Sequence, residues 1–381
     1  MNRDARAAVR ALRVGVVPSM CVERLTMGRI DFEKKFEPHL RRLVEQGTCA
    51  PVFLLGEWGT GKSHMLSLVH AAARRLKLPT TRGSVDASSN ALNYPQRLYP
   101  SLMERILEAG TSALGLREIV SGWLRDAVKR EALAAFTRRC QNTGLAQVLQ
   151  GLCQFQSHGS APVDNEAAWS FLLGADLAWA NYGYKRLQAL DRLGWVARCF
   201  QGMGQGGLVL TLDEVETIAQ LWNMRSRATA YGVLAHLFRT PGLGCLLGIT
   251  ERFDGVVAYD LSRGILDASW LSEDAYWFLS TWNSGGFERV SIPEFGSEQA
   301  EEMVLTIAQL YREAYDIPGD DLSWVRTVLA DWRGNPSRNT RRLIRLTIHR
   351  LDLINPPRGV ETALTRAEMG NLHSGVGRDQ R

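Results

Sequence analysis

The chain has 381 residues, of which 45% are hydrophobic, so it is long enough for one large or two modest domains with a substantial core. No apolar stretch approaches the ~20 residues needed to cross a bilayer, no secretory signal opens the chain, and six scattered cysteines without a CxxC pair argue against a disulfide framework or structural zinc. The formal charge is only +5, and just six of the 45 basic residues are lysines. This arginine bias is more simply explained by the amino-acid usage of the source genome than by a nucleic-acid-binding surface. We therefore expect a cytoplasmic protein without a membrane segment.

Residues 1–50 are predicted to form an N-terminal helical segment. Ala7, Ala8, Ala11 and Leu12 have the spacing of one helix face, and a second helix is expected from about residue 31 to 46. A break at residues 14–18 separates the two helices.

The most informative stretch is Gly56-Glu57-Trp58-Gly59-Thr60-Gly61-Lys62-Ser63, here called the glycine-rich loop. It follows an apolar strand at 51–55 and precedes a helix that includes 65–73, which is the context expected for a phosphate-binding (Walker A) loop. The glycines let backbone N–H groups point at phosphate oxygens, and the helix N-terminus adds partial positive charge. Lys62 would reach the β- and γ-phosphates of ATP and Ser63 would ligate Mg²⁺, with His64 next to them. The alternative is a β–α turn that happens to carry Lys-Ser.

The break at 14–18 lies shortly before this loop. In many P-loop ATPases an N-terminal segment covers the adenine ring, and Val16, Val17 and Pro18 offer a flat apolar contact for it. The alternative is a loop that packs on the core.

The rest of the chain alternates between one long helical region and further strands. A second strand is expected at 78–86, and residues 90–203 show helical periodicity, which predicts a helical insertion. Its tryptophans at 123, 169, 179 and 195 fit a core better than a platform for stacking bases.

Further strands are expected at 207–212, 244–249 and 287–292. Five strands joined by helices predict an α/β fold with a parallel sheet covered on both faces. The expected organisation is a core at 51–292, a helical lid at 293–355 and a flexible tail at 356–381.

Two adjacent acids, Asp213 and Glu214, end the strand at 207–212. Opposite a phosphate-binding loop, Asp213 would hold Mg²⁺ as a Walker B aspartate does, and Glu214 would orient or deprotonate the attacking water. By themselves, such acids are typical of a helix N-terminus.

Polar residues near the ends of later strands are further candidates. Thr250 follows the strand at 244–249, where it would sense the γ-phosphate, or it is an ordinary strand-end threonine. Arg252, Arg263 or Arg289 would serve as an arginine finger across a subunit boundary.

The densest basic cluster lies at 334–350, where Thr340 is expected to cap a helix. Arg338 or Arg341 would reach the nucleotide as a second sensor. The alternatives are a solvated cationic face and a contact with nucleic-acid phosphates.

These motifs resemble the ATP-binding proteins of bacterial BREX phage-defence systems, the BrxC/BrxD-like group of P-loop ATPases. The resemblance spans nearly the whole chain, and the Gly28-Arg29 pair and the final lid are also similar to origin-recognition-type AAA+ ATPases. The stretches that carry it are residues 11–18, 28–29, 56–63, 169–174 and 206–214.

The resemblance implies an ATPase that acts beside DNA-modifying or DNA-translocating partners in anti-phage defence. It supports Lys62, Ser63, Asp213 and Glu214 in their roles and places Val17 and Gly28 near the base. The chain differs from larger family members because it lacks their long additional segments and shows no winged-helix module. Direct sequence-specific DNA binding is therefore not expected.

The leading hypothesis is a Mg²⁺-dependent, oligomeric ATPase switch or motor. A second hypothesis is a nucleotide-gated scaffold that recruits a helicase or methyltransferase without substantial turnover. A kinase is a third, although no acceptor pocket is evident from the sequence.

Overall fold

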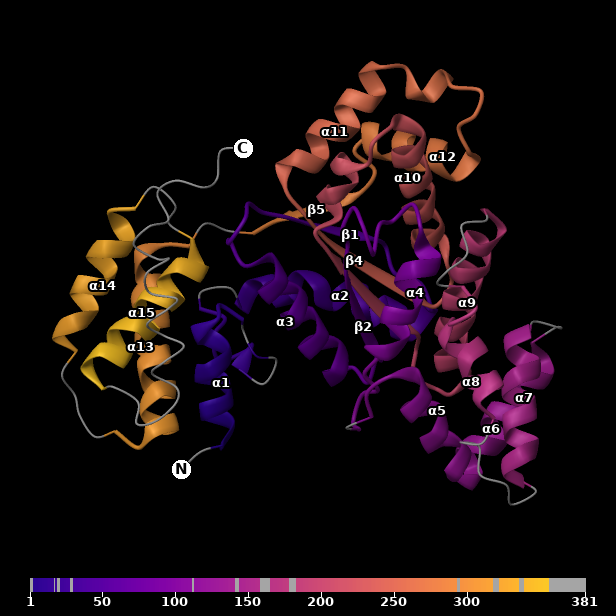
Figure 1. The fold of residues 1–381 in the computed structure, drawn as a ribbon, viewed down its shortest axis with the longest axis horizontal. Coiled ribbons are helices and arrows are strands. Elements are labelled where there is room, and N and C mark those ends of the chain that lie inside the picture. Colours follow the sequence, from indigo (N-terminus) through magenta and orange to yellow (C-terminus); the bar gives the residue numbers. More distant parts are fainter. Residues whose placement is uncertain are drawn as a thin grey trace. The chain divides into compact units, whose positions relative to one another are not determined.

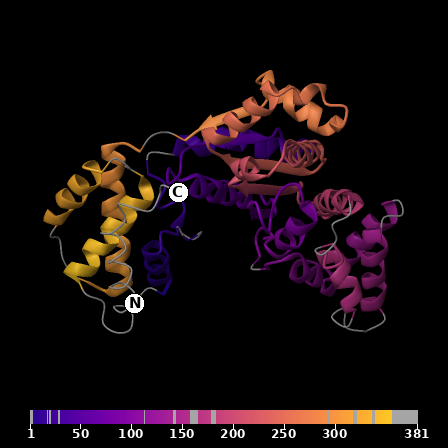
Figure 2. The same ribbon diagram turned by 45° about the horizontal axis from the view of Figure 1, so that its top comes forward.

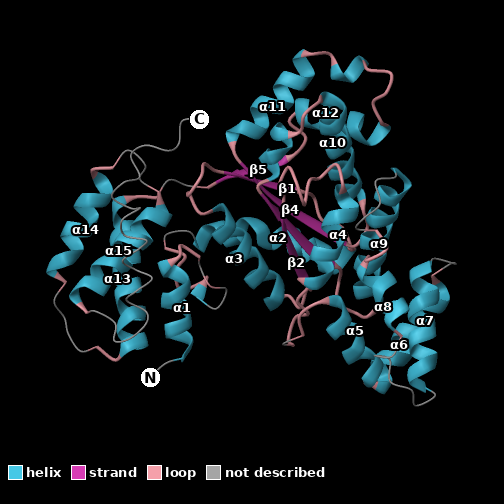
Figure 3. Ribbon diagram, in the orientation of Figure 1, coloured by secondary structure: helices cyan, strands magenta, loops and turns pink. Residues whose placement is uncertain are grey.

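Five strands pair into one parallel sheet. The structure, a computed structural model, describes residues 3–16, 18, 21–27, 30–111, 113–140, 144–157, 165–177, 183–292, 295–317, 322–335 and 339–355. The strands are β1 (Val52–Leu55), β2 (Thr80–Ser84), β3 (Leu208–Asp213), β4 (Leu243–Ile249) and β5 (Glu288–Ser291). Their order is β2-β3-β4-β1-β5 and all neighbours are parallel, while most of the remaining described chain is helical (Figure 3). The predicted α/β class and five-stranded parallel sheet are confirmed.

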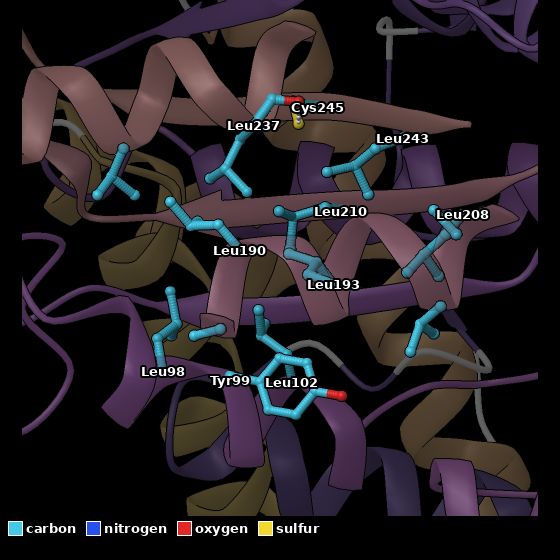
Figure 4. Packing of buried hydrophobic residues seen from close by; sticks show 14 of the residues in the cluster. Leu98, Tyr99, Leu102, Leu190, Leu193, Leu208, Leu210, Leu237, Leu243 and Cys245 are labelled. Carbon is cyan, nitrogen blue, oxygen red and sulfur yellow. Dashed lines mark hydrogen bonds between the residues drawn. The ribbon is translucent and has the colours of Figure 1, made fainter. Parts of the chain in front are cut away.

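Helices cover both faces of the sheet (Figure 2). Alternate residues of β3 point to opposite faces. Thr211 and Asp213 meet α3 (Lys62–Arg75), which packs with α2 (Ile30–Gln46). Leucines of β3 face α4 (Pro95–Glu104) and α9 (Gly183–Gly202), and β4 packs against α10 (Met224–Arg239) on the same side (Figure 4). Both faces of β3 are buried, which explains why its sequence is apolar apart from Thr211 and the terminal Asp213.

The region between β2 and β3 is a set of helices that shares the core of the sheet. It comprises α4, α5 (Leu116–Arg125), α6 (Ala127–Arg139), α7 (Gly144–Ser157), α8 (Glu166–Leu173) and α9. Trp123, Trp169 and Trp195 are buried in this core, whereas Trp179 lies outside the described residues. The buried tryptophans therefore serve packing.

The chain forms two compact units, residues 29–293 and residues 1–28 together with 294–381. The larger unit is completed by η3 (Val215–Gln220), α11 (Glu251–Ser262), η4 (Ile265–Asp267) and α12 (Glu273–Asn283). The smaller unit contains α1 (Arg3–Arg13), α13 (Ser297–Tyr315), α14 (Ser323–Arg333) and α15 (Thr340–Ile354) (Figure 1).

The first and the last of the described helices pack together in the smaller unit. Helix α1 packs on α13 and α15. The Arg13 guanidinium binds the Asp352 carboxylate at 2.7 and 3.0 Å, and the Tyr311 hydroxyl donates to the same carboxylate at 2.7 Å. The predicted segment 1–50 is thus divided, because α1 belongs with the C-terminal helices and α2 with the sheet.

The expected cap of the last helix was wrong by one residue. Asn339 is the N-cap of α15, and its side chain accepts a hydrogen bond from the Arg342 N–H at 2.9 Å. Thr340 is the first residue of the helix instead. Asparagine caps at least as well as threonine, so the sequence offered two neighbouring choices.

Candidate functional site

The glycine-rich loop connects the end of β1 to the start of α3. Gly59 and Gly61 have φ angles of 81° and 102°, a region that side chains disfavour. A Cβ at Gly56 would lie 2.7 Å from Thr60 Oγ1, so this glycine permits the close turn. The Gly56 N–H donates to the Ile249 carbonyl at 3.1 Å and ties the loop to the end of β4.

The first turn of α3 is open at its N-terminus. Gly61 is the N-cap and no side chain caps the helix, so the first N–H groups are available to an anion. Lys62, the first helical residue, donates from Nζ to the carbonyl of Gly56 at 2.7 Å and to that of Glu57 at 3.4 Å. The exposed ring of Trp58 lies 5.7 Å from the same amine. These contacts keep the amine over the loop, where a phosphate would replace the carbonyls.

The loop and the acidic end of β3 meet directly. Ser63 donates from Oγ to Asp213 Oδ2 at 2.5 Å, although the two residues are 150 positions apart. A Cβ at position 248 would lie 2.8 Å from Asp213 Oδ1, so Gly248 of β4 makes room for this carboxylate. The structure thus brings the Ser63 hydroxyl and one Asp213 carboxylate oxygen together at the loop.

The Ser63 and Asp213 oxygens fit a Mg²⁺ site that has few protein ligands. Across the described ranges, no group of three or more His, Cys, Asp or Glu side chains is arranged to hold a metal ion. Mg²⁺ usually keeps several waters and takes one or two protein ligands plus substrate phosphates. The Ser63–Asp213 pair matches that pattern and does not match an all-protein metal cage.

Glu214 is held in a strained conformation. Its φ of 59° and ψ of 33° are left-handed values that cost free energy for a residue with a side chain. The Glu214 N–H donates to Asp213 Oδ1 at 2.9 Å, and Ser84 Oγ of β2 donates to Glu214 Oε2 at 3.3 Å. The turn therefore keeps both acids at the edge of the sheet that carries the loop.

Thr250 lies at the same edge. It follows β4 directly, next to the point where Ile249 accepts the hydrogen bond of Gly56. The side chain is buried, and within the part of the chain that the structure describes, its Oγ1 has no hydrogen-bond partner. A buried hydroxyl without a partner is costly, so this position is suited to a ligand.

Sequence reasoning missed a third acid, Glu216. It lies in η3, is 3% exposed, and no hydrogen bond reaches either carboxylate oxygen from another described residue. Burial raises its pKa; its own backbone N–H and the charge of Lys62 oppose this shift, while Asp213 and Glu214 add to it. The spacing Asp-Glu-x-Glu was visible in the sequence, but the burial depends on how η3 packs against β4 and α11.

The remaining candidates are not joined to this group. Arg289 pairs with Phe53 in the β1–β5 ladder, binds Asp254 at 3.0 Å and lies over the Trp282 ring at 4.0 Å. Its contacts are therefore in α11 and α12 and not in the glycine-rich loop. Arg341 is exposed at the start of α15 in the smaller unit, and His64 is half-buried in the first turn of α3. Val17, Gly28 and Arg338 lie outside the described residues.

The sequence profile of the family described as BREX system ATP-binding protein BrxC/D matches residues 1–154 and 184–361. The chain belongs to this BrxC/BrxD family. The match includes the glycine-rich loop, both acids that end β3, and the helices of the smaller unit. The predicted resemblance is confirmed, and this BrxC/BrxD chain is a member of an ATP-binding family.

The chain is also similar to a solved structure. The Aeropyrum pernix Orc1 protein in complex with DNA is similar with a TM-score of 0.42 and 14% sequence identity, over 90% of this chain and 65% of that chain. No significant match was found among curated proteins. No helix in the described ranges of this BrxC/BrxD chain is long and apolar enough to cross a membrane.

Proposed function

We propose that this protein binds ATP with Mg²⁺ at the glycine-rich loop, hydrolyses it, and acts as an AAA+-like switch or motor in a BREX defence complex. The single observation that carries the proposal is the 2.5 Å hydrogen bond between Ser63 and Asp213. It joins the loop that would hold the phosphates to the acids that would support hydrolysis.

Each residue at this edge has a role in the proposal. Backbone N–H groups of Gly59, Gly61 and Lys62 bind phosphate oxygens, and Lys62 exchanges the Gly56 carbonyl for the β- and γ-phosphates. Ser63 and Asp213 hold Mg²⁺, which when bound neutralises charge on the phosphate oxygens. Glu214 orients the attacking water or accepts its proton, and Thr250 donates its hydroxyl near the γ-phosphate.

Other parts of the proposal extend beyond this edge. The proposal also includes Val17 and Gly28 near the base, as the family resemblance implies, and Arg338 or Arg341 as a second sensor. Arg289 acts as an arginine finger toward a neighbouring copy in a homo-oligomer. To do so, its guanidinium must leave Asp254. The partners are DNA-associated defence proteins such as a helicase or methyltransferase, with DNA bound without sequence preference.

Matched variants test the hydrolysis step. Lys62→Ala should abolish binding of a fluorescent ATP analogue, whereas Glu214→Gln should keep binding and lower the rate of phosphate formation by about 10²-fold or more. Lys129→Ala removes an exposed lysine of α6 and should change neither property. Hydrolysis that persists unchanged in Lys62→Ala would contradict the proposal.

The same variants separate an ATPase from a scaffold. Phage protection should be lost with both Lys62→Ala and Glu214→Gln if turnover is needed. Protection that survives Glu214→Gln but not Lys62→Ala would favour a nucleotide-gated scaffold that recruits its partners without substantial turnover.

A further inference from the structure

A cavity of about 200 Å³ lies beside the Ser63–Asp213 pair, between α3 and the strands β2 and β3. Ser63, Asp213 and Ser84 line the part of the cavity next to the glycine-rich loop. Ser67 and His70 of α3 and Thr211 of β3 line it further along α3. At ~30 Å³ for each water molecule, this volume has room for a small oxyanion with a few waters.

Two arginines also line the cavity. Arg82 extends from β2, and Arg105 follows α4 where residue 107 pairs with Thr80 along the edge of the sheet. Both side chains belong to exposed residues, and neither guanidinium has a hydrogen bond or ion pair with another described residue. Guanidinium groups bind phosphate oxygens through paired, charge-assisted hydrogen bonds.

The wall of the cavity is uncharged along α3. His70 accepts or donates one hydrogen bond at 2.8 Å with Thr211 Oγ1. Burial, together with the charges of Arg82 and Arg74, lowers the pKa of His70 to about 3. His70 is thus neutral at physiological pH, and the positive charge of the cavity lies at Arg82 and Arg105. The negative charge lies at Asp213, which a metal ion would offset.

We propose that this cavity is a phosphate-binding site through which the phosphate cleaved from ATP leaves, passing from Ser63 and Asp213 toward Arg82 and Arg105. The exit route rests on the proposed hydrolysis, whereas phosphate binding in the cavity does not. Ser63 and Asp213 are hydrogen-bonded to each other in this structure, and both side chains would give up that bond when they hold Mg²⁺.

Phosphate binding is tested first, with radiolabelled inorganic phosphate in equilibrium dialysis. The protein is saturated with Mg²⁺ and a non-hydrolysable ATP analogue, so that phosphate cannot bind in the glycine-rich loop. Arg82→Gln and Arg105→Gln should each weaken phosphate binding by about fivefold or more, the range expected for losing one charge-assisted contact at an exposed site.

Arg74→Gln is the matched control, because Arg74 also lowers the pKa of His70 yet does not line the cavity. Its phosphate affinity should stay within twofold of the wild type. Absence of phosphate binding to the wild type under these conditions, or an equal loss in Arg74→Gln, would overturn the cavity as a phosphate site.

The exit route is tested in a single turnover, by comparing ATP cleavage after acid quench with phosphate release seen by a fluorescent phosphate-binding reporter. The double variant Arg82→Gln/Arg105→Gln should cleave ATP within twofold of the wild-type rate and release phosphate at least about fivefold more slowly. Unchanged release would overturn the route. If the wild type shows no cleavage, the proposed hydrolysis fails, while dialysis still decides whether the cavity binds phosphate.

Discussion

The contact between α10 and α11 and the sheet edge at η3 each bury an acid, but they satisfy it differently. Asp260 of α11 is fully buried and receives two hydrogen bonds from Arg227 and one from Tyr231, at 2.5 to 3.0 Å. Glu216 of η3 is nearly as buried, and no hydrogen bond reaches its oxygens from another described residue. A fully paired acid supports packing, whereas an unpaired one costs stability that a bound ligand is able to repay.

The same difference extends to the neighbours of the two acids. Thr250 has an unpartnered buried hydroxyl and Glu214 a left-handed backbone, and both lie at the edge that carries the glycine-rich loop. Where β1 faces α10 and α12, by contrast, aromatic rings pack together, such as Phe53 against Phe238 and Trp282. An unpartnered hydroxyl, an unpaired acid and a left-handed backbone thus occur together at the edge where a ligand is proposed, whereas elsewhere such features are scattered, as at Lys77, Asp316 and Trp195.

The largest expected effect is on the paired acid. Asp260→Ala should lower the free energy of unfolding by about 3–5 kcal/mol, because it leaves the Arg227 charge and the Tyr231 hydroxyl without their buried partner. Urea unfolding followed by circular dichroism measures this change. A loss below about 1 kcal/mol would mean that the pairing contributes little and that the comparison is mistaken.

Thr250→Val preserves the shape of the side chain and removes only the hydroxyl. Because no described residue bonds that hydroxyl and its burial is costly, the free energy of unfolding should not fall and is expected to rise by about 1 kcal/mol. If Thr250 donates to the reacting phosphate, kcat for ATP should fall by about 10²-fold, or ~2.7 kcal/mol. Unchanged turnover would return Thr250 to the role of an ordinary strand-end residue.

His70, a third buried ionisable residue, makes the stability of the larger unit depend on pH. Its pKa is about 3 in the folded protein against 6.5 when unfolded, so below pH 6.5 the unfolded chain binds a proton that the folded chain does not. Unfolding free energy should therefore fall as pH drops from 6.5 toward 3, by ~2 kcal/mol between pH 7 and pH 5. In His70→Gln, the fall in unfolding free energy between pH 7 and pH 5 should be smaller by that amount. Urea unfolding of both proteins at the two pH values measures this difference. Equal losses in both proteins would contradict the buried neutral histidine.

The smallest effect is expected for Glu216→Gln. The amide cannot become charged and no hydrogen bond is lost, so the unfolding free energy should rise or change by less than about 1 kcal/mol. Thermal unfolding in the absence of nucleotide measures it. A loss comparable to that of Asp260→Ala would show that Glu216 is a structural acid after all.

Much of this architecture was predictable because its signals are local. The apolar run of β3, the glycine spacing of the loop and the acids after the strand each lie within about ten residues, and together they predict the strands and the edge where they end. The family could also be predicted from stretches along the whole chain.

Features that depend on distant contacts were not predictable. The burial of Glu216 requires η3 to pack on α11, and the cavity beside α3 requires residue 107 to pair with Thr80. The division of residues 1–50 depends on Arg13 meeting Asp352, 339 positions away. No local pattern carries information about such pairs.

The pairing of the chain ends in the smaller unit has a consequence for biosynthesis. Helix α1 leaves the ribosome before the sheet, yet its buried face, Ala5, Ala8, Val9 and Leu12, packs on helices that are made after the sheet. The sheet can close as soon as β5 emerges, whereas α1 must wait with an apolar face uncovered until α15 is complete. Nascent chains stalled before residue 340 should therefore hold a folded larger unit and an N-terminal helix that is still accessible to chaperones.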